Sequence, residues 1–504
     1  MQALLVTEPI EVLQDIIECL IHSSLREKFT KYLSATAQFL KYRYKHHVAL
    51  SQTDNCSTHN INYVLGRMSV YDNSIRKYEK KGITCFQCRF PFYVCAEIKK
   101  QVMCCEIDNG NSTTNTTILS KKQDALNVVD ECNRKFKLFM SHSARCTNQN
   151  KAIQKIHDDM INECYARSKS VTALMIGDFK MKFEPLSSRE TTIDHYGKRG
   201  ISWHGFCIQF YLLQNMMLED GSTIEKEQKY TVYIDQIISD GNKQDSLSVF
   251  SLLDAALAQI KNELPFITNI ILQTDNAKTY NNAFLLCGIP FLNVIYGGCK
   301  NLAITQFIHT ETQDGKTVLD AHFARCMKHI KHFMSRSKSN KISKIGTARG
   351  LGYALSHNGG MKNVMIQVVN TNRNKVEKIY QKFEIVINGL KTYFTRINHA
   401  YFTRSESGQK LEQQTTNNGT SLDVIDGMIF YIGVQAYSNV NRIVTFHIDM
   451  TKPKSKLTPD NVVNEEIEFN LKSNATTATT AVLTTTAAVA TTQQRQQQWQ
   501  RRQC

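Results

Sequence analysis

The stretch Ile270–Asn282, IILQTDNAKTYNN, decides the fold class of this chain. Its apolar start is typical of a buried strand, and Asp275 follows where the strand should leave its sheet. One interpretation of this aspartate is a helix N-cap, since Asp before a helix is common and stabilising. The other is a metal ligand, because carboxylate oxygens are the ligands that Mg²⁺ prefers. Other carboxylates in the chain have to decide between the two.

Strand and helix patterns alternate around this stretch in the order β-β-β-α-β-α-β-α. Strands are expected at 171–183, 201–214, 229–239, 267–275 and 303–311, and helices at 246–264, near 279–288 and at 317–334. This order predicts an α/β domain with a mixed sheet and helices covering its faces.

Three aspartates recur at the ends of these predicted elements. Asp178 sits at the end of the first strand's apolar run, LMIGD, Asp275 ends the fourth strand, and Asp320 falls on the first turn of the last helix. This pattern predicts a carboxylate cluster for two Mg²⁺ or Mn²⁺ ions, the arrangement used for in-line phosphodiester attack. Glu311 and Asp314, just before the helix, are alternatives for the third ligand.

Four motifs amount to a family resemblance. They are GDFKMKFEP, YGKRGISWHG, QTDNAKTYNN and ETQDGKTVLDAHF. Together with the element order, they resemble the ribonuclease-H-like core of DDE/D transposases and retroviral-type integrases, and more narrowly an uncharacterised group of eukaryotic mobile-element proteins. The resemblance covers about residues 56 to 360.

The resemblance implies a ribonuclease-H-like mixed sheet and an activity on DNA. Asp178 and Asp275 match the first two catalytic acids, and Asp320 is the third. The implied partners are transposon ends and target DNA, with a homo-oligomer assembled on them, and the implied reaction is cleavage and strand transfer. Lys198 and Arg199, in a predicted hairpin beside Asp178, are candidates for binding the phosphates that flank the scissile bond.

A Cys/His cluster precedes this core. Cys56 and His59, then Cys85 and Cys88, form two short chelating pairs that suit one structural, tetrahedral Zn²⁺. Buried free thiols are the alternative explanation. Further cysteines offer other ligands, namely Cys95, Cys104, Cys105, Cys132 and Cys146.

Composition and periodicity divide the chain into six regions. We expect a helical N-terminal region (1–50), a Cys/His-rich zinc-binding module (51–108), a helical segment (109–170), the catalytic core (171–340), a small α+β C-terminal region (341–470) and a disordered Thr/Ala/Gln-rich tail (471–504). Within the second region we expect an irregular run from 56 to 105. In the third, helices are expected at about 121–139 and 150–167.

The charge balance favours an acidic partner. Lys and Arg number 61 against 45 Asp and Glu, a net charge of +16, and nucleic acid is the first candidate. No segment reaches the roughly 18 apolar residues needed to cross a bilayer, and the first 20 residues do not resemble a secretory signal. We therefore expect a nuclear protein with no membrane partner and with reduced cysteines.

The sequence leaves three hypotheses for function. The first is an active transposase-like enzyme with a three-aspartate, two-metal site. The second is a domesticated or decayed copy that binds DNA without cutting it, and the third is a structure-specific nuclease. A nucleotide-driven motor is disfavoured, because the sequence has no phosphate-binding loop of the G-x-x-x-x-G-K-[ST] type.

Overall fold

The computed structural model describes a defined part of the chain. It covers residues 3–49, 85–104, 115–168, 170–184, 186–187, 200–217, 223–297, 302–310, 318–336, 344–390, 399–402, 429–435 and 444–449. Several sequence predictions lie outside these ranges, namely those on Cys56, His59, Cys105, Lys198, Arg199, Glu311, Asp314 and the tail from 471 to 504. The chain divides into two compact units, the first ending at residue 154 and the second beginning at residue 155.

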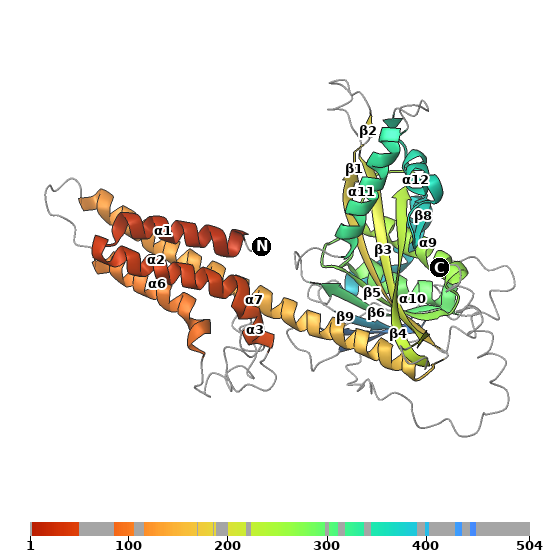
Figure 1. The fold of residues 1–504 in the computed structure, drawn as a ribbon, viewed down its shortest axis with the longest axis horizontal. Helices are drawn as coiled ribbons and strands as arrows, with labels where there is room; N and C mark the ends of the chain where they lie inside the picture. Colours follow the sequence, from red (N-terminus) through yellow and green to blue (C-terminus); the bar gives the residue numbers. More distant parts are fainter. Residues whose placement is uncertain are drawn as a thin grey trace. The chain divides into compact units, whose positions relative to one another are not determined.

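The first unit is built from helices. They are α1 (Glu8–Leu20), α2 (Ser23–Gln38), α3 (Tyr44–Ala49), α6 (Phe86–Cys104) and the first part of α7 (Asn115–Tyr165), with π-helical turns at Ala3–Thr7 and Phe39–Arg43. Figure 1 shows α1, α2, α6 and the start of α7 side by side. Their apolar faces form one core, which includes Leu13, Ile17, Phe29, Val94 and Phe136.

Two sequence predictions for this unit were wrong. The run expected to be irregular contains the 19-residue helix α6, which tolerates Pro91 in its second turn. The two helices expected at 121–139 and 150–167 are one continuous helix of 51 residues. The polar stretch between them stays helical because Met140 and Ala144 are buried in the core, so that tertiary packing outweighs weak local propensity.

The second unit contains a nine-stranded mixed sheet. Its order is β11-β10-β9-β6-β5-β1-β3-β4-β8. The strands are β1 (Val171–Phe183), β3 (Ile201–Met217), β4 (Thr223–Ile238), β5 (Ile267–Asp275), β6 (Ala303–Thr310), β8 (Val364–Val369), β9 (His399–Phe402), β10 (Ile429–Gln435) and β11 (Val444–Asp449). A separate pair joins β2 (Leu186–Ser187) to β7 (Lys344–Ile345).

The five central strands lie in the order β6-β5-β1-β3-β4. β3 runs antiparallel to both β1 and β4, whereas β5 is parallel to β1 and to β6. This confirms the α/β fold class and the mixed sheet. The C-terminal strands extend this same sheet: β8 joins the edge beyond β4, and β9 the edge beyond β6.

Helices cover both faces of the sheet (Figure 1). On one face, α9 (Ser246–Glu263), α10 (Ala283–Gly297) and α13 (Arg373–Leu390) share a core with Phe206 and Ile208 of β3. On the other face, α11 (Val318–Arg336) and α12 (Ala348–Ser356) pack on Trp203 and Cys207 of the same strand. After α12 the chain makes a short 3₁₀ turn, His357–Gly359, and leaves it through Gly359 and Gly360, which have positive φ angles of +80° and +72°.

Candidate functional site

Asp178 and Asp275 lie side by side on neighbouring parallel strands. The register between β1 and β5 pairs Gly177 with Thr274, so the two aspartates come next along the same ladder. Residues at equivalent positions of paired strands point to the same face of the sheet. The fold therefore brings together two of the three predicted acids.

Asp275 is not the cap of the following helix. Helix α10 begins at Ala283, and the side chain of Asn282 accepts a hydrogen bond from the Leu285 backbone N–H at 3.0 Å. Asp275 instead accepts from the Ala277 backbone N–H at 3.2 Å, which fixes its carboxylate at the strand end. Of the two initial interpretations, the helix cap is excluded.

The pKa of Asp178 reflects its burial and the nearby acids. Burial raises its pKa, and the negative charges of Asp275 and then Asp320 raise it further, to about 7. Burial also raises the pKa of Asp275. Adjacent carboxylates that disfavour one another's charge are a typical arrangement for a site that gains a cation.

Helix α11 carries the third aspartate to the same region. Gly205 of β3 is the ladder partner of Asp178, and Leu319 and Phe323 of α11 pack directly over it. A Cβ at Gly205 would lie 2.8 Å from the Phe323 ring, so only glycine allows this close approach. Asp320, next to Leu319, is exposed, and its charge reaches Asp178.

The ligand atoms of the three aspartates are more widely spaced than those of a compact metal site. Within the part of the chain that the structure describes, two other groups have all three ligand atoms within 4.8 Å of one another, and the three aspartates do not. Their donor set, three carboxylates with hard oxygen atoms, nevertheless fits Mg²⁺ or Mn²⁺. These ions bind through few carboxylates and keep several water ligands, so a looser spacing than that of a zinc site is compatible with them.

Tyr280 is a neighbour of this site that sequence reasoning missed. Its side chain is buried, and burial together with the charges of Asp178 and Asp275 raises the pKa of its phenol well above the usual value. Its ring lies 6.0 Å from that of Phe179. The sequence does not indicate that Tyr280 lies beside the two acids. It shows only an aromatic residue five positions after Asp275.

His204 is separated from the acids by the sheet. It pairs with Phe179, the neighbour of Asp178, so its side chain points to the opposite face. It is completely buried, and burial lowers the pKa of its imidazole to about 3. His204 is therefore a neutral core residue.

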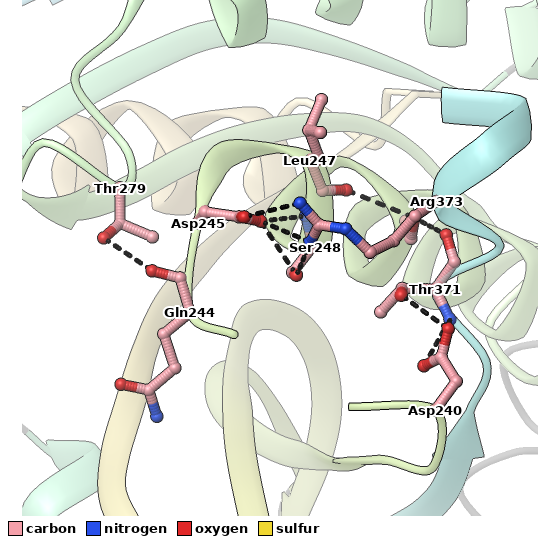
Figure 2. A network of polar contacts seen from close by, with 9 residues as sticks. Asp240, Gln244, Asp245, Leu247, Ser248, Thr279, Thr371 and Arg373 are labelled. Atoms are coloured by element: carbon pink, nitrogen blue, oxygen red, sulfur yellow. Dashed lines mark hydrogen bonds and ion pairs between the residues drawn. The ribbon is translucent and has the colours of Figure 1, made fainter. Parts of the chain in front are cut away.

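Polar contacts of Gln244, Asp245 and Arg373 connect several segments of the second unit (Figure 2). Asp245 caps α9 by accepting from the Ser248 backbone N–H at 3.0 Å, and Arg373 of α13 donates to both of its oxygens, at 2.8 and 3.1 Å. The side-chain amide of the neighbouring Gln244 donates to the Lys180 backbone carbonyl at 3.4 Å. The backbone carbonyl of Gln244 accepts from the Thr279 hydroxyl at 3.3 Å. The network thus ties the chain just after Asp178 to the chain just after Asp275.

The first unit contains a separate group with zinc-type ligands. Cys85 and Cys88 lie with their sulfur atoms 3.7 and 3.9 Å from Nδ1 of His47. The two cysteines belong to the predicted zinc set, whereas His47 was missed because it comes 38 residues earlier, in a stretch with helical spacing. These three residues could hold a metal ion, and a buried group of Asp235, His322 and Cys326 could hold another.

Comparison with known proteins gives one match. A family model described as a domain of unknown function (DUF8701) matches residues 157–414. The chain belongs to this family. The DUF8701 region contains all three candidate acids and the sheet from β1 to β9. No curated protein and no solved structure matches the chain.

The structure also bears on the expected absence of membrane segments. No helix in the described ranges is both long enough and apolar enough to cross a membrane.

Proposed function

We propose that this DUF8701 protein is a metal-dependent DNA-processing enzyme of the transposase type. Asp178, Asp275 and Asp320 hold two Mg²⁺ or Mn²⁺ ions, and the reaction is phosphodiester cleavage followed by strand transfer. The observation that supports the proposal is the proximity of Asp178 and Asp275, each the residue after the last pair of the β1–β5 ladder, where the charge of Asp275 raises the pKa of Asp178.

The site's own residues have distinct tasks in this proposal. Asp178 and Asp275 supply ligand oxygens from rigid strands, while Asp320 supplies one from the first turn of α11. The ions, when bound, activate the attacking oxygen and stabilise the leaving oxygen. The Ala277 N–H holds the Asp275 carboxylate in place, and Gly205 keeps α11 close enough for Asp320 to take part.

Helix α11 also supports a DNA partner. Beyond Asp320, its exposed side carries Arg325, Lys328 and Lys331 at helical spacing, and no further acid. Basic side chains in one row contact successive phosphates, and such contacts supply most sequence-independent affinity.

The proposal is tested with supercoiled plasmid DNA, which reports nicking without knowledge of the natural target sequence. We expect nicking that requires Mg²⁺ or Mn²⁺ and that is lost in Asp178→Asn and Asp275→Asn, but kept in Glu263→Gln, a change of an exposed acid on α9. DNA binding without nicking by the wild type would instead favour the decayed, DNA-binding remnant. Nicking without joining of end-mimicking DNA to a target would favour the nuclease.

A further inference from the structure

A compact group of three side chains lies between α11 and β4. Nε2 of His322 is 2.9 Å from Oδ2 of Asp235, and the Cys326 sulfur is 3.6 Å from the same oxygen and 3.3 Å from the same nitrogen. One atom from each residue therefore forms a compact triangle with edges of 2.9, 3.3 and 3.6 Å. His322 and Cys326 are one helical turn apart, and all three side chains are buried.

The triangle has the dimensions of a transition-metal ligand set. Zinc bonds of about 2.0–2.3 Å in a tetrahedron place ligand atoms roughly 3.3–3.6 Å apart. Two of the three observed edges lie within this range, and the third, between Asp235 and His322, is 2.9 Å. A carboxylate, an imidazole and a thiolate are all zinc ligands.

The surroundings orient the ligand atoms toward one point. Trp203 donates from Nε1 to Oδ1 of Asp235 at 3.0 Å, which leaves Oδ2 directed at the helix. The Tyr233 ring stacks on His322, with centroids 3.9 Å apart and planes 3° from parallel, and so fixes the imidazole plane. Such outer contacts are characteristic of metal sites, where they set the direction of each ligand.

Charge also favours an ion at this position. A buried carboxylate is costly unless it is paired, and an aspartate, a thiolate and a neutral imidazole carry two negative charges in total. A divalent cation brings this buried group to zero net charge. Binding would release the Cys326 thiol proton to solvent and place the His322 proton on Nδ1.

We propose that Asp235, His322 and Cys326 bind one divalent transition-metal ion of the zinc type, which fastens α11 to β4. Three protein ligands leave a fourth position for water, as in other three-ligand zinc sites. The site is distinct from the three carboxylates and does not depend on DNA cleavage. It bears on them structurally, because His322 follows Asp320 by two residues and Asp235 pairs with Gly205, the ladder partner of Asp178.

The test uses Co²⁺, whose bond to a thiolate gives an intense near-ultraviolet absorption that carboxylate ligands do not produce. It is added to the full chain carrying Cys85→Ser and Cys88→Ser, which removes both thiolates of the group that contains His47. We expect one equivalent of thiolate-bound Co²⁺ per chain. The absorption should be lost when Cys326→Ser or His322→Gln is added, and kept with Cys287→Ser, an equally buried cysteine on the opposite face of the sheet.

His322→Gln keeps a hydrogen-bond donor facing Asp235, so it guards against a loss of signal caused by unfolding, and circular dichroism checks each variant. Absence of the absorption in the starting protein with its fold intact would overturn the proposal and leave a purely hydrogen-bonded network. Survival of the absorption in both folded variants would overturn it as well. Because the readout is metal binding, a failure of DNA cleavage does not affect it.

Discussion

Gly205 lies opposite Asp178 in the β1–β3 ladder, and Phe323 and Leu319 of α11 contact the sheet directly over it. The absence of a side chain at this position lets Phe323 and Leu319 rest on the strand. The helix that carries Asp320 is thereby held beside the strand that carries Asp178.

Adding one methyl group at Gly205 should push the helix away. A Cβ there would lie 2.8 Å from Phe323, so Gly205→Ala should cost roughly 1–3 kcal/mol of unfolding free energy and weaken Mn²⁺ binding. Gly241→Ala is the matched control, because no atom lies within 4 Å of a Cβ at that position. Urea denaturation and calorimetry measure the two effects, and equal behaviour of the two variants would contradict this account.

The pKa of Asp178 predicts a pH dependence of stability. Its value of about 7 in the folded chain lies above the ordinary 3.8, so the folded state binds more protons between these values. The stability of the metal-free protein should therefore fall as the pH rises from about 4 to about 7. Asp178→Asn should reduce this fall and be more stable than the wild type at pH of about 8.

The measurement is the urea midpoint at several pH values in the presence of a chelator, with Glu263→Gln as the control. Saturating Mg²⁺ should stabilise the wild type at high pH, because it binds the ionised carboxylates of the folded state. The same pH profile in wild type and Asp178→Asn would show that this carboxyl does not carry the shift.

Arg373 should stabilise the folded chain through its two hydrogen bonds to the Asp245 carboxylate. Arg373→Ala removes both charge-assisted hydrogen bonds of a partly buried pair and should cost about 1–3 kcal/mol of stability. Arg373→Lys keeps the charge but not the planar fork, so its cost should be intermediate. Thermal denaturation checks the order, and a lysine variant as unstable as alanine would show that charge contributes nothing here.

The first unit should lose stability when its zinc-type group is disrupted. Zn²⁺ bound by His47, Cys85 and Cys88 would be part of the folding free energy of this unit, and His47→Ala should lower both zinc content and stability. Cys19→Ser, a change at an exposed cysteine, should alter neither. Metal analysis by mass spectrometry checks the first effect, and an unchanged zinc content in His47→Ala would remove His47 from the ligand set.

The sheet was predictable because its signals are local. Each central strand is an apolar run bounded by polar turns, and the strand containing Asp275 ends at that residue, as expected. The element order did not identify β1 and β5 as neighbours, because β3 and β4 lie between them in the sequence. Asp178 was expected at the end of its strand, but β1 continues for five residues beyond it, to Phe183. The identity of the acids as metal ligands remains a prediction.

Other features depend on contacts that are distant in sequence. His47 meets Cys85 only after the first unit folds, and no spacing rule links them. Asp235 stands in the buried, mostly apolar second half of β4, where a buried charge signals a partner, but nothing local identifies His322 on a helix 87 residues later. The unbroken α7 likewise depends on burial of Met140 and Ala144, because the polar residues around them have weak helix propensity.

Calorimetric Mn²⁺ titration of the wild type and of Asp275→Asn tests the central claim most directly. Both proteins are made in a background that carries Cys85→Ser, Cys88→Ser and Cys326→Ser. The titration then measures the carboxylate site, and 'wild type' refers to its three aspartates. The account predicts micromolar binding to the wild-type acids and its loss in Asp275→Asn, with the fold unchanged by circular dichroism. Equal binding by both folded proteins, or none by either, would contradict the assignment of Asp178, Asp275 and Asp320 as a metal-binding active site.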